Sequence, residues 1–193
     1  MNLLRVIIRR FDNWLSRVEG VEPFTDDPQC IMRIQIGRID HQLTFPNQVI
    51  QPNSPALFIH FWNEHMPVIP DKGPELSYGL KLQRMIIYSM KLIADHIQKD
   101  PFLNDIQVVG GITTFVSREA ADGGRATFLH LGFSLFPHRR AAGAFGEFWE
   151  NFYIWWLMLA YNPVSARHRK MLEMQHSEFW MTKEQFLDRF GKN

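Results

Sequence analysis

The densest cluster of side chains able to do chemistry lies in one short stretch of the chain. It brings two imidazoles, one amide and one carboxylate into six residues, and its members are His60, Asn63, Glu64 and His65. A histidine oriented by a carboxylate can act as a general base, and the amide of Asn63 can hold an oxyanion or a sugar hydroxyl. An extended strand advances about 3.3 Å per residue, so His60 and Glu64 would lie about 13 Å apart unless the chain bends. Pro67 favours such a bend, and the cluster then predicts a transferase or hydrolase site.

The same cluster also has a structural interpretation. His60 can be a hydrogen-bonded core residue, while Asn63 and Glu64 satisfy turn amides and His65 faces water. A metal site at His60 and His65 is disfavoured because the H-E-x-x-H pattern is absent. We therefore expect neither a metal nor a cofactor.

A glycine pair, Gly110-Gly111, follows a predicted strand at 106–109. Backbone amides at such a pair can form a small anion nest. The surrounding residues match neither G-x-G-x-x-G nor a Walker loop, so we interpret the pair as a structural turn. In an enzyme this turn would lie beside the His60 cluster.

A second candidate surface is the aromatic segment 145–161, which holds eight Phe, Trp and Tyr residues and has basic residues on both sides. Tryptophan and tyrosine favour the headgroup level of a membrane, and each basic residue near an anionic leaflet contributes on the order of 1 kcal/mol. The segment predicts contact with an anionic membrane surface or a protein partner through Arg139, Arg140, Trp149, Trp155, Trp156, Arg167 and Arg169. The alternative is a helix that is apolar on all sides because it is buried against the sheet.

Composition restricts the class of partner. The chain has 193 residues and a formal net charge of +1, so we expect no nucleic-acid partner. The single cysteine, Cys30, cannot form an internal disulfide, and the N-terminus has no signal-peptide core, so we expect a cytoplasmic protein with possible membrane association. The longest apolar run, 152–161, would span about 15 Å as a helix, against about 30 Å for a bilayer core. No membrane span is therefore expected.

The elements that position these residues follow from hydrophobic periodicity. Apolar residues at intervals of three and four predict an amphipathic helix over 1–20 and a long helix over 75–99. Strand patterns over 32–36 and 56–62 and a hairpin over 41–50 belong to an α/β core at 21–137. A strand at 106–109, helix formers over 117–131 and a strand at 133–136 predict a strand-helix-strand crossover.

The C-terminal part, 138–193, is predicted to be helical. One helix covers about 144–161, and Thr182 with Gln185 forms a capping-box pattern before a last helix that ends at Gly191. We expect a single domain of the α/β or α+β class, with one sheet, the crossover unit and helices at both ends.

An amphipathic start is followed in order by three short motifs: His60-Phe61-Trp62-Asn63-Glu64-His65-Met66-Pro67, Gly110-Gly111-Ile112-Thr113 and Leu131-Gly132-Phe133. This arrangement resembles the YkoP-like domain of bacteria over Phe11 to Pro137. The resemblance implies little about activity, since that family is largely uncharacterised. Some members accompany cell-envelope polysaccharide or glycosyl-transfer enzymes, which implies a role near envelope lipid or glycan metabolism.

Three functional interpretations remain from the sequence. The first is an accessory or binding domain at the cytoplasmic membrane face, or on a protein partner, that uses the aromatic segment and its arginines. The second is a transferase or hydrolase with the His60, Asn63 and Glu64 site. The third is a structural subunit whose two clusters are buried in an oligomer.

Overall fold

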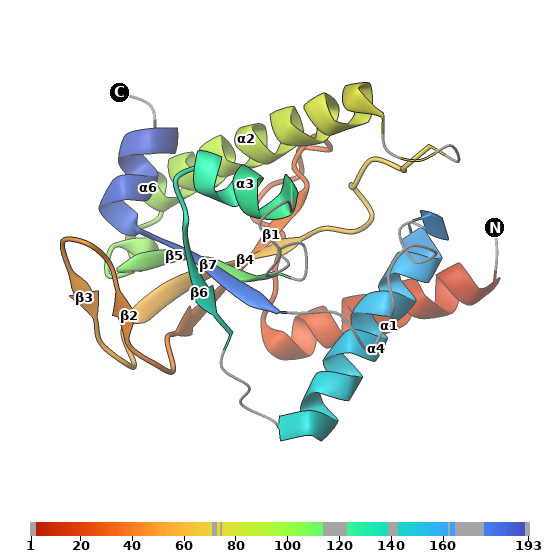
Figure 1. The fold of residues 1–193 in the computed structure, drawn as a ribbon, viewed down its shortest axis with the longest axis horizontal. Coiled ribbons are helices and arrows are strands. Elements are labelled where there is room, and N and C mark those ends of the chain that lie inside the picture. The colour runs from red at the N-terminus through yellow and green to blue at the C-terminus, as the bar shows by residue number, and fades with distance from the viewer. Residues whose placement is uncertain are drawn as a thin grey trace.

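A five-stranded mixed sheet forms the centre of the molecule, with helices on both sides of it (Figure 1). The computed structural model describes residues 3–70, 73, 75–113, 123–138, 143–161, 163–164 and 176–191. The architecture has both α and β elements and a helix at each end, as the sequence predicts. In chain order the elements are α1 (Leu3–Glu19), β1 (Met32–Arg38), β2 (Leu43–Thr44), β3 (Val49–Ile50), β4 (Pro55–Phe61), α2 (Leu76–Lys99), the 3-10 helix η1 (Pro101–Leu103), β5 (Val108–Thr113), α3 (Gly123–His130), β6 (Ser134–Pro137), α4 (Gly143–Tyr161), β7 (Ser177–Thr182) and α6 (Lys183–Phe190).

The strand order of the main sheet is β1-β4-β5-β7-β6. Strands β4 and β5 are parallel, and the other neighbours are antiparallel. Strands β5 and β6 both run opposite to β7, so they are parallel to each other and are joined through α3. The predicted crossover is therefore present, with β7 inserted between its two strands. The predicted hairpin is also present, as the pair β2–β3.

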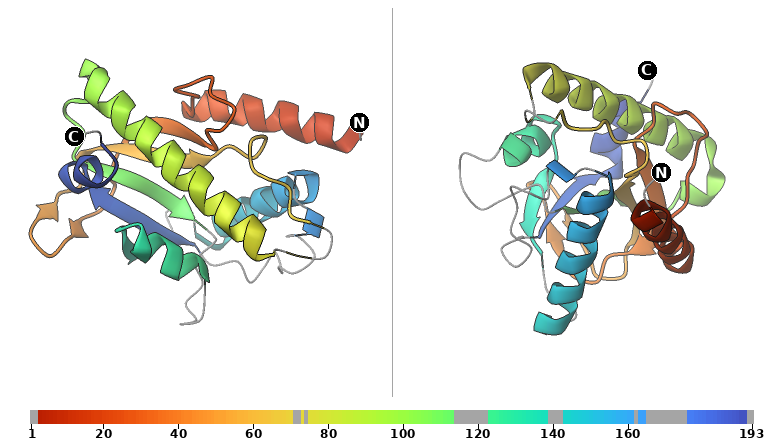
Figure 2. Two further views of the ribbon diagram at one scale, coloured as in Figure 1. Left: turned by 90° about the horizontal axis from the view of Figure 1, so that it is seen from above. Right: turned by 90° about the vertical axis from the view of Figure 1, so that its right-hand side faces the viewer.

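One face of the sheet packs against α2, α3 and α6, and Figure 2 shows α2 running across it. Because side chains alternate along a strand, Leu57 and Ile59 on β4 share this face with Phe179 and Met181 on β7. These residues belong to the largest apolar core, together with α2 residues such as Ile93. The core fixes the sheet against its three helices.

The opposite face packs against the hairpin β2–β3 and, farther along, against α1 and α4. Trp180 and Val108 contribute to a second core with hairpin residues, and Phe58 meets Trp180 edge-on. Figures 1 and 2 show α1 and α4 lying side by side, away from α2. The buried polar network and the exposed aromatic residues described below belong to this second side of the molecule.

The glycine pair Gly110-Gly111 lies inside β5, so its interpretation as a turn was wrong. A Cβ on Gly110 would stand 2.0 Å from the carbonyl oxygen of Phe179, and one on Gly111 would stand 2.7 Å from that of Ile59. Only glycine fits so close to the neighbouring strands. The two glycines therefore allow the neighbouring strands to pack closely, and they lie within the strand pairing of the sheet.

Strand β7 departs from the expectation of a helical C-terminal part. Its residues are buried on both sides of the sheet, with Glu178 and Trp180 on one face and Phe179 and Met181 on the other. The apolar run that encodes it is only a few residues long, and period alone does not distinguish such a run from buried helix. The next segment follows the prediction, because Thr182 forms the capping box that begins α6.

Candidate functional site

His60 lies on β4, and its side chain is partly buried. Its Nε2 lies 2.9 Å from the side-chain oxygen of Gln35 on the neighbouring strand. Burial, with a smaller contribution from the Arg33 guanidinium, lowers the pKa of His60 to about 4. At neutral pH the imidazole is therefore uncharged, and one of its nitrogens is already engaged.

The other members of the predicted cluster have separate partners. Glu64 forms an ion pair with Arg9 of α1 at 2.7 Å, and the Tyr161 hydroxyl of α4 donates to it at 3.4 Å. Burial and the Glu64 carboxylate raise the pKa of Tyr161 to about 12. Glu64 therefore connects the turn after β4 to both helices.

His65 and Asn63 complete the turn after β4. The Nδ1 of His65 lies 2.7 Å from the backbone oxygen of Cys30, and its ring stacks on Trp62 with centroids 3.8 Å apart. Asn63 is partly buried. Within the described part of the chain, no hydrogen bond or ion pair joins His60 to Glu64.

Behind His60 lies a buried polar network that sequence reasoning did not identify. Asp12 of α1 and Arg33 of β1 are 3% and 7% exposed, and their side chains approach to 3.6 Å. Arg33 also donates to Ser16 at 2.8 Å, and the Tyr153 hydroxyl of α4 donates to Asp12. Burial and this bond raise the pKa of the Tyr153 hydroxyl far above its usual range. The network joins both helices to the sheet.

The network determines which side of α1 faces outward. Asp12, Ser16 and Ile8 point inward, and the strongest apolar stripe of the helix is left on the surface. Its members are 39–73% exposed and recur every three or four residues: Leu3, Ile7, Phe11, Trp14 and Val18. The sequence showed that α1 is amphipathic but could not show that polar residues would occupy its buried side.

Aromatic rings of α4 continue this stripe. Phe11 of α1 contacts Trp156 with ring centroids 5.7 Å apart, and Trp156 stacks on Phe152 at 6.2 Å. Phe152 in turn meets Phe148 and Trp149, which are 41% and 51% exposed. We call this continuous surface the aromatic face, and it consists of Leu3, Ile7, Phe11, Trp14, Val18, Phe148, Trp149, Phe152 and Trp156.

The predicted aromatic contact residues are therefore not all alike. Trp149 is half exposed, whereas Trp155 and Trp156 are partly buried. The four predicted arginines, Arg139, Arg140, Arg167 and Arg169, lie outside the described residues. On α1, Arg10 and Arg17 are exposed and follow Ile7 and Trp14 by three positions, so they border the aromatic face.

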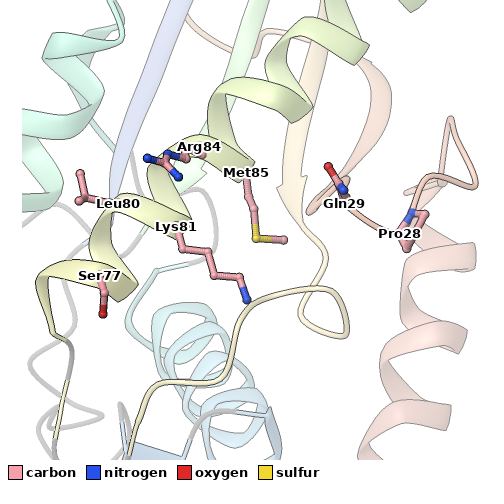
Figure 3. A pocket seen from close by; sticks show the side chains of 7 residues that line it. All are labelled: Pro28, Gln29, Ser77, Leu80, Lys81, Arg84 and Met85. Carbon is pink, nitrogen blue, oxygen red and sulfur yellow. The ribbon is translucent and has the colours of Figure 1, made fainter.

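A separate surface hollow lies between α2 and the turn that precedes β1 (Figure 3). Its volume is about 600 Å³, it is open to solvent, and it is lined by Pro28, Gln29, Ser77, Leu80, Lys81, Arg84 and Met85. Most of these side chains are exposed, and none belongs to the predicted clusters. The hollow therefore provides two cations on an open surface rather than an enclosed site.

The described residues lack both the side-chain cluster of a metal site and the apolar helix of a membrane span. They contain no group of three or more His, Cys, Asp or Glu side chains arranged to hold a metal ion. None of the helices that the structure describes combines the length and the apolarity needed to cross a bilayer.

Comparison with known proteins identifies one family. The chain matches the family described as YkoP domain over residues 2–190, a wider stretch than the 11–137 of the resemblance seen in the sequence. No curated protein and no solved structure matches the chain.

Proposed function

The chain belongs to the YkoP domain family, and we propose that it is a binding domain that docks on an anionic membrane surface through its aromatic face. One observation carries this proposal. The apolar stripe of α1 is exposed along the whole helix and continues without a break into the rings of α4. A water-exposed surface of this kind is typical of a contact region.

The apolar residues of the aromatic face provide the attraction. Full burial of one large apolar side chain is worth about 1.5–3 kcal/mol. The face includes Trp14 and Trp149, which are 57% and 51% exposed and belong to a residue type that favours the headgroup level. An amphipathic helix that lies in the interface plane buries such a stripe to a depth of about 5–10 Å. The α1 stripe has the length and the exposure for this mode of binding.

Charge favours an anionic membrane over a neutral one. Arg10 and Arg17 are exposed beside the stripe, and their long side chains can keep the guanidinium in the headgroup region while the stem lies on the apolar surface. Each such residue contributes on the order of 1 kcal/mol near an anionic leaflet. Arg9 points elsewhere, because it pairs with Glu64.

The rival enzyme at the His60 cluster has less support. His60, Glu64 and His65 each bond to a different partner, and the low pKa of His60 leaves it a weak base. A general base and its orienting carboxylate need direct contact. Through Glu64, the cluster contacts Arg9 of α1 and Tyr161 of α4.

Co-sedimentation with vesicles tests the docking proposal. We expect wild-type protein to pellet with vesicles of phosphatidylcholine and phosphatidylglycerol, less so with phosphatidylcholine alone, and less at high salt. The variant Trp14→Ser with Trp149→Ser should lose binding. Phe102→Ser is the matched control, because Phe102 is 89% exposed on η1, outside the aromatic face.

The basic residues have their own pair of variants. Arg10→Gln with Arg17→Gln should weaken binding to the anionic vesicles, while Lys91→Gln on the exposed side of α2 should not. Absence of wild-type binding to anionic vesicles would overturn the proposal. Equal binding by the tryptophan double variant and by Phe102→Ser would also overturn it, and a protein partner would then be the better occupant.

A further inference from the structure

A buried carboxylate on the hairpin side of the sheet faces three ring nitrogens. Glu178 of β7 is 4% exposed. Its Oε1 lies 3.1 Å from Nδ1 of His138, and its Oε2 lies 3.3 Å from Nε2 of His41 and 2.8 Å from Nε1 of Trp180. An ionised carboxylate accepts such bonds and donates none. Each oxygen of Glu178 therefore faces at least one ring nitrogen.

His41 lies between this carboxylate and a second one. Its Nε2 faces Glu178, and its Nδ1 lies 2.6 Å from Oδ1 of the exposed Asp40. Each ring nitrogen of His41 therefore faces a carboxylate oxygen, so neither nitrogen is open to another molecule.

His138 differs from His41 because only one of its ring nitrogens has a partner among the residues that the structure describes. The residue directly follows β6, and its side chain is 14% exposed. Its Nδ1 is held by Glu178, while Nε2 makes no hydrogen bond to any residue that the structure describes. With the proton on Nδ1, the lone pair lies on Nε2, which is the arrangement of an imidazole general base. The ring of His176, held by Asn151 at 2.7 Å, stands beside it at a centroid distance of 5.7 Å.

We propose that His138 is the general base of an acyl-transfer site and that Glu178 is its positioning residue. The substrate class is a carboxylic ester, with water or a hydroxyl group as the acceptor. Nε2 takes the acceptor's proton while the acceptor oxygen forms a bond to the acyl carbon. The bond from that carbon to the leaving oxygen then breaks, and the leaving oxygen takes the proton from Nε2. Glu178 stabilises the imidazolium that exists between these two transfers.

The geometry favours ester chemistry over glycoside hydrolysis. Glycosidases place two carboxyl groups on either side of the bond that breaks, and one of them must donate a proton. Glu178 is the carboxylate that faces His138, and its Oε2 already accepts the Trp180 indole N–H, so the group is placed to orient an imidazole. A carboxylate that orients an imidazole is the arrangement used to activate a hydroxyl toward an acyl group. The inference is independent of the aromatic face.

Hydrolysis of p-nitrophenyl acetate by the full chain tests this assignment. His138→Asn is the decisive variant, since its amide nitrogen can take the place of Nδ1 and keep the bond to Glu178 while Nε2 is lost. General bases contribute about 10²–10⁴-fold, so we expect the rate to fall at least about tenfold. His130→Asn is the matched control, because His130 is exposed on α3. Equal rates for the two variants, or a wild-type rate no higher than that of free imidazole, would overturn the proposal.

The positioning role of Glu178 is tested by a measurement that does not change when only stability is lost. Glu178→Gln should lower the hydrolysis rate, and Glu178→Asp should restore part of it, at matched unfolding temperatures. Loss of activity in both variants in proportion to lost stability would contradict that role.

Reagent mapping of the wild-type protein keeps the proposal testable if the variants misfold. Diethyl pyrocarbonate acylates the open nitrogen of a neutral imidazole and releases ethyl carbonate. Mass spectrometry should find His138 modified well before His41. Modification of both at the same rate would contradict the assignment of an open Nε2 to His138 alone.

Discussion

Replacing Tyr153 by phenylalanine tests whether buried polar contacts hold α1 and α4 to the sheet. The Tyr153 hydroxyl donates to Asp12, which is 3% exposed and also faces Arg33. Without the hydroxyl, Asp12 loses a donor in a place that water does not reach. A hydrogen bond to a charged group contributes about 1.5–3 kcal/mol, so Tyr153→Phe should lower the free energy of unfolding by about 2 kcal/mol.

The chain offers a closely matched control for this substitution. Tyr88 also donates its hydroxyl to an aspartate, Asp27, but this pair is exposed. Tyr88→Phe removes the same chemical group, and water can replace the lost bond, so we expect little change in stability. Urea unfolding followed by circular dichroism measures both variants, with linear extrapolation to water. Equal losses for Tyr153→Phe and Tyr88→Phe would refute the reasoning.

A double-mutant cycle separates the direct bond from general disturbance of α4. Asp12→Asn combined with Tyr153→Phe should cost less than the sum of the two single variants, by on the order of 1 kcal/mol. Strict additivity of the two losses would show that the hydroxyl and the carboxylate do not act on each other.

Two other predictions follow from the sheet. The pKa of His60 is about 4 in the folded protein against 6.5 when exposed, so as pH falls from about 6.5 to 4 the unfolded chain takes up a proton that the folded chain does not. The free energy of unfolding should fall over this window by at most about 3 kcal/mol. Urea unfolding of His60→Gln should show a smaller loss over the same pH range. Equal pH dependence of wild type and variant would contradict the lowered pKa of His60. Gly110→Ala should lose about 3 kcal/mol or more, because its Cβ would strike the Phe179 carbonyl. A Cβ on Gly79 of α2 would meet nothing within 4 Å, so Gly79→Ala should raise the free energy of unfolding by about 0.5–1 kcal/mol. A similar loss of stability in both glycine variants would refute the steric argument.

The elements that the sequence predicted well are those whose signals are local. Apolar spacing predicted α2 and α4 within a residue or two of their ends, and Thr182 with Gln185 predicted the start of α6. These signals depend on contacts within a few positions of the chain. The interpretation of Gly110-Gly111 as a turn was wrong because no local signal explains these glycines. They are required by the close approach of strands β4 and β7, which are distant in sequence.

The sequence alone did not indicate that Glu178, His41 and His138 lie together. Glu178, His41 and His138 are separated by long stretches of chain and are brought together only by the order of the strands. No spacing rule connects them. The one local signal is a carboxylate in the apolar run of β7, which a strand buries only when partners satisfy it.

The orientation of α1 was also beyond the sequence. Its periodicity predicted an amphipathic helix but did not show which side would face the protein. In the fold, the partner of Asp12 is Arg33 on β1, and this pairing turns the polar side inward. A buried charge is placed by its counter-charge, and hydrophobic patterning carries no information about which counter-charge that is.

The insertion of β7 between β5 and β6 has a consequence for how the chain is made. Strand β6 has β7 as its only neighbour in the described sheet, and β5 has β7 on one side. During synthesis β5 and β6 leave the ribosome before Ser177–Thr182 has been made. Their backbone groups that face β7 therefore stay without hydrogen-bond partners in the sheet until β7 is added. The sheet therefore cannot close until β7 has been made, and until then the unpaired edges of β5 and β6 leave the nascent chain dependent on protection from aggregation.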